Sequence, residues 1–133
     1  MSGPLRISAA ESQILEAIWA TPEGAAGVEE IIGAVGEANS WGESTVRTLI
    51  HRLIGKGALK SERRRGAVVY SPLLSRSDYV TSESQGLLDR LFGGQLAPLV
   101  DHFTRERVVS PEDLARLKKL VADLDRNAAD EEG

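Results

Sequence analysis

One continuous segment, residues 41–72, constrains the fold more than any other part of the chain. The segment is predicted to contain an amphipathic helix over residues 43–56, which ends at Gly57 as a left-handed cap. Two short strands, residues 59–63 and 67–71, follow it. At 100° per residue, the apolar side chains of that helix fall on one side and its hydroxyl and basic side chains on the other. An amphipathic helix with an acid-poor polar face, followed directly by a hairpin, is typical of a winged helix-turn-helix.

The basic residues of the chain are concentrated in the same segment. Residues 42–76 hold eight basic side chains against two acidic ones, a net of +6, whereas residues 1–41 and residues 77–133 each carry a net of −5. A basic island inside a chain of net charge −4 indicates one localised face for a polyanion, here double-stranded DNA. The predicted DNA-binding residues are Ser44, Thr45, Arg47, Thr48, His51, Arg52, Lys56, Arg63, Arg64 and Arg65.

Two parts of this predicted interface differ in chemistry. Ser44, Thr45 and Thr48 have side chains able to reach base edges or thymine methyl groups, whereas Lys56 is expected to contact phosphate. The opposing interpretations are that the hydroxyls only cap the N-terminus of the helix, and that the arginines of residues 63–65 form a solvated hairpin tip. The position of these arginines, one hairpin after a basic helix, favours DNA binding.

Two further helices are predicted before this segment. Residues 8–11, with the sequence SAAE, match the S-x-x-E capping box, and apolar residues then recur at the spacing of one buried stripe. A second helix, residues 28–35, has one apolar side but contains glycine, so packing must stabilise it. With the helix of residues 43–56 and the hairpin, these elements make a winged-helix domain predicted over residues 1–74.

The rest of the chain is predicted to be helical, without a basic face. Helices are expected over residues 77–92 and 96–104, and a third begins at Ser110-Pro111, a cap residue with proline at the first helical position. The apolar seam of these helices could cover the first domain, but self-association would bury it better. We therefore expect a helical dimerisation domain over residues 75–127 and a frayed tail over residues 128–133. The predicted dimer contacts are Leu88, Leu91, Phe92, Leu99, Phe103, Leu114, Leu117, Val121 and Leu124.

Composition excludes several classes of function. The chain has no cysteine, which removes disulfides, zinc ribbons and thiol catalysis. It also has no phosphate-binding glycine loop, no H-E-x-x-H sequence and no recognisable nucleophile elbow, so we expect neither enzyme activity nor a cofactor or metal. Because there is no apolar run of about 18 residues and no N-terminal signal, we expect a cytoplasmic protein without membrane insertion.

The chain resembles the penicillinase-repressor family of bacterial repressors over residues 7–125. The resemblance rests on four segments in this order: SAAESQILEAIW, NSWGESTVRTLIHRLIGKGAL, VVYSPLLSRSDYV and GLLDRLFGGQLAPLVDHF. It implies a mainly α fold with a small β-hairpin wing, made of an N-terminal winged helix-turn-helix and a C-terminal helical dimerisation domain. It further implies a homodimeric transcriptional repressor that binds an inverted-repeat operator. The alternative function is a winged-helix scaffold that binds protein and not DNA.

The resemblance also implies a way of releasing the DNA. In the lactamase branch of the family, a membrane sensor-protease triggers a cut in the C-terminal domain at an Asn-Phe bond. The aligned pair here is His102-Phe103, which is therefore the implied cleavage position, with a sensor-protease as the implied partner. The copper-responsive branch carries C-terminal cysteines, and their absence from this sequence disfavours metal sensing.

Overall fold

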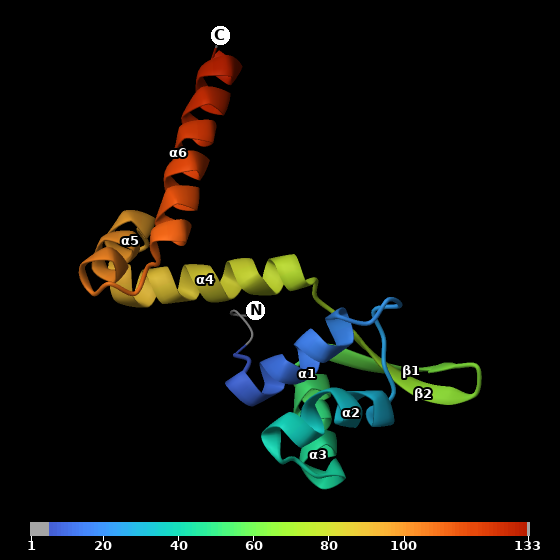
Figure 1. Ribbon diagram of the computed structural model, residues 1–133. Coiled ribbons are helices and arrows are strands. Elements are labelled where there is room, and N and C mark those ends of the chain that lie inside the picture. The colour runs from blue at the N-terminus through green and yellow to red at the C-terminus, as the bar shows by residue number, and fades with distance from the viewer. Residues whose placement is uncertain (1–5, 133) are drawn as a thin grey trace. The chain divides into compact units, whose positions relative to one another are not determined.

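The structure of the chain, a computed structural model, describes residues 6–132 and divides after Glu83 into two units (Figure 1). The division lies inside helix α4 (Arg76–Phe92). The predicted domain limits stay a prediction, and their outermost parts, residues 1–5 and Gly133, lie outside the described residues. The expected fold class is confirmed, since the elements are helices apart from one antiparallel hairpin.

Three helices supply most of the core of the N-terminal unit. They are α1 (Ala9–Trp19), α2 (Val28–Asn39) and α3 (Glu43–Gly55), and each packs against the other two (Figure 1). The apolar stripes predicted from helical spacing meet at their centre, where aliphatic side chains exclude water. The core consists of Ile14, Leu15, Ile18, Ala26, Ile31, Val35, Val46, Leu49, Ile50, Leu53, Ala58 and Leu59.

The local sequence predicted the start of α1 but not the end of α2. At α1 the predicted capping box is confirmed, because the Glu11 backbone N–H donates to Ser8 Oγ at 3.1 Å and the Ser8 N–H donates to Glu11 Oε1 at 2.8 Å. Helix α2 runs four residues beyond the predicted end at residue 35. The extra turn is held by Asn39, whose side-chain amide donates to Gln13 Oε1 of α1 at 2.7 Å.

The hairpin consists of β1 (Leu59–Arg64) and β2 (Ala67–Pro72), paired antiparallel. Arg65 and Gly66 join the strands with φ angles of 54° and 79°, the two positive values that a type I′ turn needs. At the other end of the hairpin, Tyr70 exchanges two backbone hydrogen bonds with Ala26. This third bridge, which no sequence pattern predicted, fastens the hairpin to the loop before α2.

The C-terminal unit contains the end of α4, then α5 (Leu96–Arg105) and α6 (Pro111–Glu132). The Ser110 hydroxyl accepts from the Asp113 N–H at 3.1 Å, so the predicted start signal of α6 is confirmed. Helix α6 continues through the residues expected to fray, where two alanines at positions 128 and 129 favour the helical state. Of the side chains described between residues 84 and 130, none is buried. No helix in the described part of the chain is long and apolar enough to cross a membrane.

Candidate nucleic-acid interface

The outer face of α3 is the centre of the candidate interface. Every predicted DNA-binding residue of this helix is exposed, while the apolar positions of the opposite face are buried. The exception to the predicted division is Ile54, which lies at the edge of the apolar face and is 36% exposed. The exposed side chains are Ser44, Thr45, Arg47, Thr48, His51 and Arg52.

The hydroxyl residues of α3 do not cap the helix. Its N-cap is Gly42, and no side chain makes a capping hydrogen bond there, so the interpretation of the hydroxyls as caps is wrong. The Thr48 hydroxyl donates to the Ser44 carbonyl one turn earlier at 3.0 Å. The hydroxyl proton of Thr48 is therefore used within the helix, and the exposed side chain offers a binding partner its methyl group and the oxygen as an acceptor.

Lys56 is paired within the protein, although its side chain is 36% exposed. Its ammonium donates to Glu11 Oε1 and to the Arg6 carbonyl, both at 2.6 Å, so two of its three N–H donors are used within the N-terminal unit. These bonds join the end of α3 to the start of α1. As a phosphate contact Lys56 stays a prediction, with one donor still free to make it.

Glu11 is the buried partner in this ion pair. It is 1% exposed, and its Oε2 atom has no hydrogen-bond partner among the described residues. Burial raises the pKa of Glu11, but the hydrogen bonds from Lys56 and Ser8 together outweigh it, so its pKa lies below the usual value. The sequence predicted Glu11 as part of the capping box but not its burial or its pairing with Lys56, although it precedes Ile14, Leu15 and Ile18 at the i, i+3, i+4, i+7 spacing of the buried stripe.

The hairpin separates its arginines between its two faces. Arg64 Nη2 lies 2.9 Å from Glu62 Oε1, which also accepts from the Ser71 hydroxyl at 3.1 Å. The hydrogen bond from Ser71 and the nearby cations lower the pKa of Glu62, so this carboxylate is charged at neutral pH and offsets the charge of Arg64.

Arg63 lies on the opposite face of the hairpin, where it pairs across the strands with Val68. Its side chain makes only a long contact, 3.5 Å, to the Gly66 carbonyl. Two of the hairpin's three arginines, Arg63 and the turn residue Arg65, are thus without a carboxylate partner among the described residues.

The base of the hairpin is fixed to the end of α3. The Ala58 N–H donates to the Leu53 carbonyl, and the Leu73 N–H donates to the Ala58 carbonyl, both at 2.9 Å. Ala58 and Leu59 are themselves in the core. The exposed face of α3 and the hairpin therefore belong to one packed unit. A domain that places a helix in a DNA groove and a hairpin on the neighbouring phosphate backbone needs the two elements fixed in this way.

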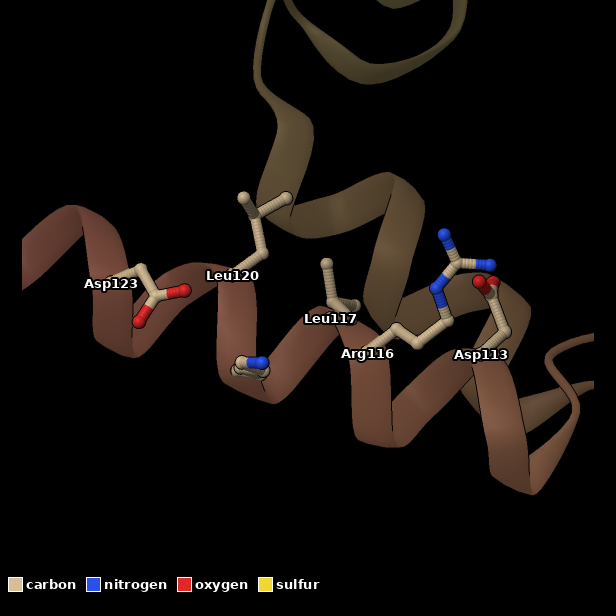
Figure 2. A pocket seen from close by; sticks show the side chains of 6 residues that line it. Asp113, Arg116, Leu117, Leu120 and Asp123 are labelled. Carbon is tan, nitrogen blue, oxygen red and sulfur yellow. The ribbon is translucent and has the colours of Figure 1, made fainter.

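The predicted dimer contacts leave an apolar surface open on the C-terminal unit. Leu91, Phe103, Val121 and Leu124 are exposed, and the other five are half-buried. A groove of about 540 Å³ lies along α6, and all of its lining residues come from that helix. Figure 2 shows their side chains. A groove lined by a single helix is an open surface rather than an enclosed active site. Its lining residues are Asp113, Arg116, Leu117, Lys119, Leu120 and Asp123.

The implied cleavage position lies within a helix. His102 and Phe103 are both exposed on α5, and the His102 ring is 6.2 Å from the Phe92 ring, measured between centroids. In the described part of the chain, no three His, Asp or Glu side chains are grouped closely enough to hold a metal ion.

Comparison with known proteins gives consistent matches. A family model described as penicillinase repressor matches residues 7–123. The chain is 29% identical over 116 residues to the penicillinase repressor of Bacillus licheniformis, an alignment that covers 87% of this chain and 89% of the relative. It is 25% identical over 122 residues to the penicillinase repressor of Staphylococcus aureus, an alignment that covers 92% of this chain and 95% of that relative.

Two of the matching solved structures are of the repressor BlaI. One is the solution structure of the DNA binding domain of the repressor BlaI, with a TM-score of 0.50, 32% identity, and coverage of 59% of this chain and 94% of that one. The other is the monomeric form of Bacillus licheniformis BlaI in complex with the blaP half-operator, with a TM-score of 0.51, 32% identity and the same coverage.

Proposed function

This chain belongs to the penicillinase repressor family, and from that premise we propose that it is a transcriptional repressor that binds operator DNA through its N-terminal unit. The observation that carries the proposal is the exposed face of α3, which presents hydroxyl and basic side chains and is followed by a hairpin with two unneutralised arginines. The likeness of this unit to the BlaI half-operator complex supports the same use of the face. We place the chain in the cytoplasm, where the operator of a bacterial repressor lies.

In this proposal α3 and the hairpin contact different parts of the DNA. Helix α3 enters the major groove, where Ser44, Thr45 and Thr48 approach the base edges. His51 and Arg52, further along the same face, contact phosphate, and the hairpin contacts the neighbouring backbone. Base contacts then set the preferred sequence, while the cations supply affinity that depends on salt.

The C-terminal unit supplies the second half of the proposal. An inverted-repeat operator needs two winged-helix units related by a two-fold axis, about one or two helical turns apart on the DNA. The open apolar surface of the C-terminal unit would be covered by a second copy of the chain. We therefore propose a homodimer held by residues of α4, α5 and α6.

The hairpin arginines provide the first test. Replacing Arg63 and Arg65 with alanine is expected to weaken binding to all DNA sequences and to lower the slope of log K against log salt by about 1.8, since each phosphate contact contributes about 0.9. Arg64→Ala is the matched control, and it should change the slope less, because Glu62 already neutralises Arg64. The measurement is a salt titration of binding to DNA from upstream of the chain's own coding region. Failure of the wild-type chain to bind contradicts the function; an unchanged slope contradicts only the hairpin contact.

Release by a sensor-protease is the mechanism that we propose for induction. A cut at His102-Phe103 would detach α6 and its apolar seam from the DNA-binding unit. Each half-site would then be held by one module without the advantage of linkage. Because the bond lies inside α5, that helix must unwind locally before a protease can bind it in extended form.

Mass spectrometry of the protein from cells exposed to a β-lactam tests this mechanism. The expected result is an N-terminal fragment that ends at His102 and rises as the repressed gene is switched on. Only full-length chain in cells whose gene is nonetheless expressed would exclude cleavage as the switch.

A further inference from the structure

An acidic residue lies in the first turn of α3, at the edge of the face that should meet DNA. Glu43 Oε2 accepts from Arg47 Nε at 2.9 Å, one turn apart on the helix. The side chains are 64% and 48% exposed, so the pair lies on the surface and not in the core. Glu43 is also the only acid in the sequence of α3.

The structural roles open to this carboxylate are weak ones: it lies in the first turn of α3, near the positive end of the helix dipole, and it pairs with Arg47. An exposed ion pair between residues i and i+4 contributes little to folding stability, because water and salt screen it. A negative charge beside a face that approaches phosphate opposes DNA binding. A carboxylate at this position therefore lowers affinity unless it acts in the bound state.

The geometry leaves the binding end of Arg47 free. The bond to Glu43 uses Nε–H, and within the described residues no other hydrogen bond involves the Arg47 side chain. The guanidinium group is planar, so a carboxylate held against Nε restricts the plane in which the two terminal nitrogens lie. Those nitrogens form the fork that matches the O6 and N7 acceptors of guanine in the major groove.

We propose that Glu43 is a positioning residue that orients Arg47 to read a guanine in each half-site, and that the pair sets part of the operator sequence. This inference rests on the proposed function. A restrained guanidinium loses less side-chain entropy on binding than a free one, so the contact with the correct base is strengthened. Adenine presents a donor in place of the O6 acceptor, and an arginine that carries only donors is mismatched to it.

The test is a selection from random DNA with the full-length chain, which measures base preference at every position. Wild type is expected to prefer guanine at one position per half-site, and Arg47→Ala to lose that preference by about fivefold or more. Glu43→Ala should lose most of the same preference while binding non-specific DNA more tightly. Glu43→Gln, which keeps an oxygen that can accept from Nε, should retain part of it.

Glu29→Ala provides the matched control, because Glu29 is an exposed acid on α2 and its removal makes the same change in charge. It should raise non-specific affinity without changing base preference. Glu43 and Glu29 both lie in the first turn of a helix, so Glu43→Ala and Glu29→Ala should change thermal unfolding alike, which separates positioning from a loss of helix stability. An unchanged base preference in Glu43→Ala would overturn the inference and leave the repressor proposal intact. A wild-type chain that binds no DNA would overturn both.

Discussion

The Leu117→Asp, Val121→Asp variant is expected to sediment as a monomer and to lose about 100-fold or more of its affinity for a two-half-site operator. Both residues belong to the apolar seam of α6, which consists of Leu114, Leu117, Val121 and Leu124. Val121 is 51% exposed and Leu117 is half-buried. In a two-fold dimer the variant would place four carboxylates in an apolar contact, where charge is costly to bury. Without the dimer, binding of the second half-site is no longer intramolecular, and its effective-concentration advantage is lost.

The matched control places the same charges on the other side of α6. Ala115 and Ala122 are exposed and lie roughly opposite the seam at 100° per residue. Ala115→Asp, Ala122→Asp should therefore remain a dimer and bind the operator as wild type does. Both variants should bind an isolated half-site alike, since α3 is unchanged. An intact dimer in sedimentation of the Leu117, Val121 variant would refute the assignment of the seam.

A second large effect is expected on folding stability. Lys56→Met should lower the free energy of unfolding by about 2–3 kcal/mol, because it leaves the carboxylate of Glu11 buried without its cation. The value is at the low end for a broken buried pair, since the Lys56 side chain is 36% exposed and water can reach part of the site. Chemical denaturation at pH 7 measures the change.

Two controls separate this effect from the loss of any lysine. Lys60→Met removes an exposed lysine of β1 and should alter the free energy of unfolding by about 0.5 kcal/mol or less. Adding Glu11→Gln to Lys56→Met should recover part of the loss, because no unpaired charge then remains in the core. A Lys56→Met variant as stable as wild type would contradict the structural role of the pair.

The same pair predicts how stability depends on pH. Since the pKa of Glu11 is lower in the folded chain than its reference value of 4.5, the ionised carboxylate stabilises the fold above that pH. This contribution is lost as the pH falls from 4.5 through the lower folded pKa. In Lys56→Met only Ser8 opposes the effect of burial, so the acid transition should move to higher pH.

Much of the fold could be predicted because its signals are local. The capping box at Ser8, the apolar stripes of α1 and α3, the turn at Gly66 and the start of α6 each depend on residues within one or two helical turns or one hairpin. At that range the covalent chain places side chains on a known face, so spacing alone decides which are buried. The exposed face of α3 in the candidate interface was predictable for the same reason.

The tertiary structure decided which of the basic side chains lack a carboxylate partner. In the sequence, Lys56, Arg63 and Arg64 are equivalent positive charges in one basic segment. Folding brings Lys56 against Glu11, 45 residues earlier in the chain, while strand register leaves Arg64 beside Glu62 and Arg63 on the opposite face. Asn39 likewise extends α2 by bonding to Gln13 of α1, and Tyr70 bridges to Ala26. Composition records the charge of a side chain, but its partner, and so the charge left for DNA, is set by contacts that form only when distant segments pack together.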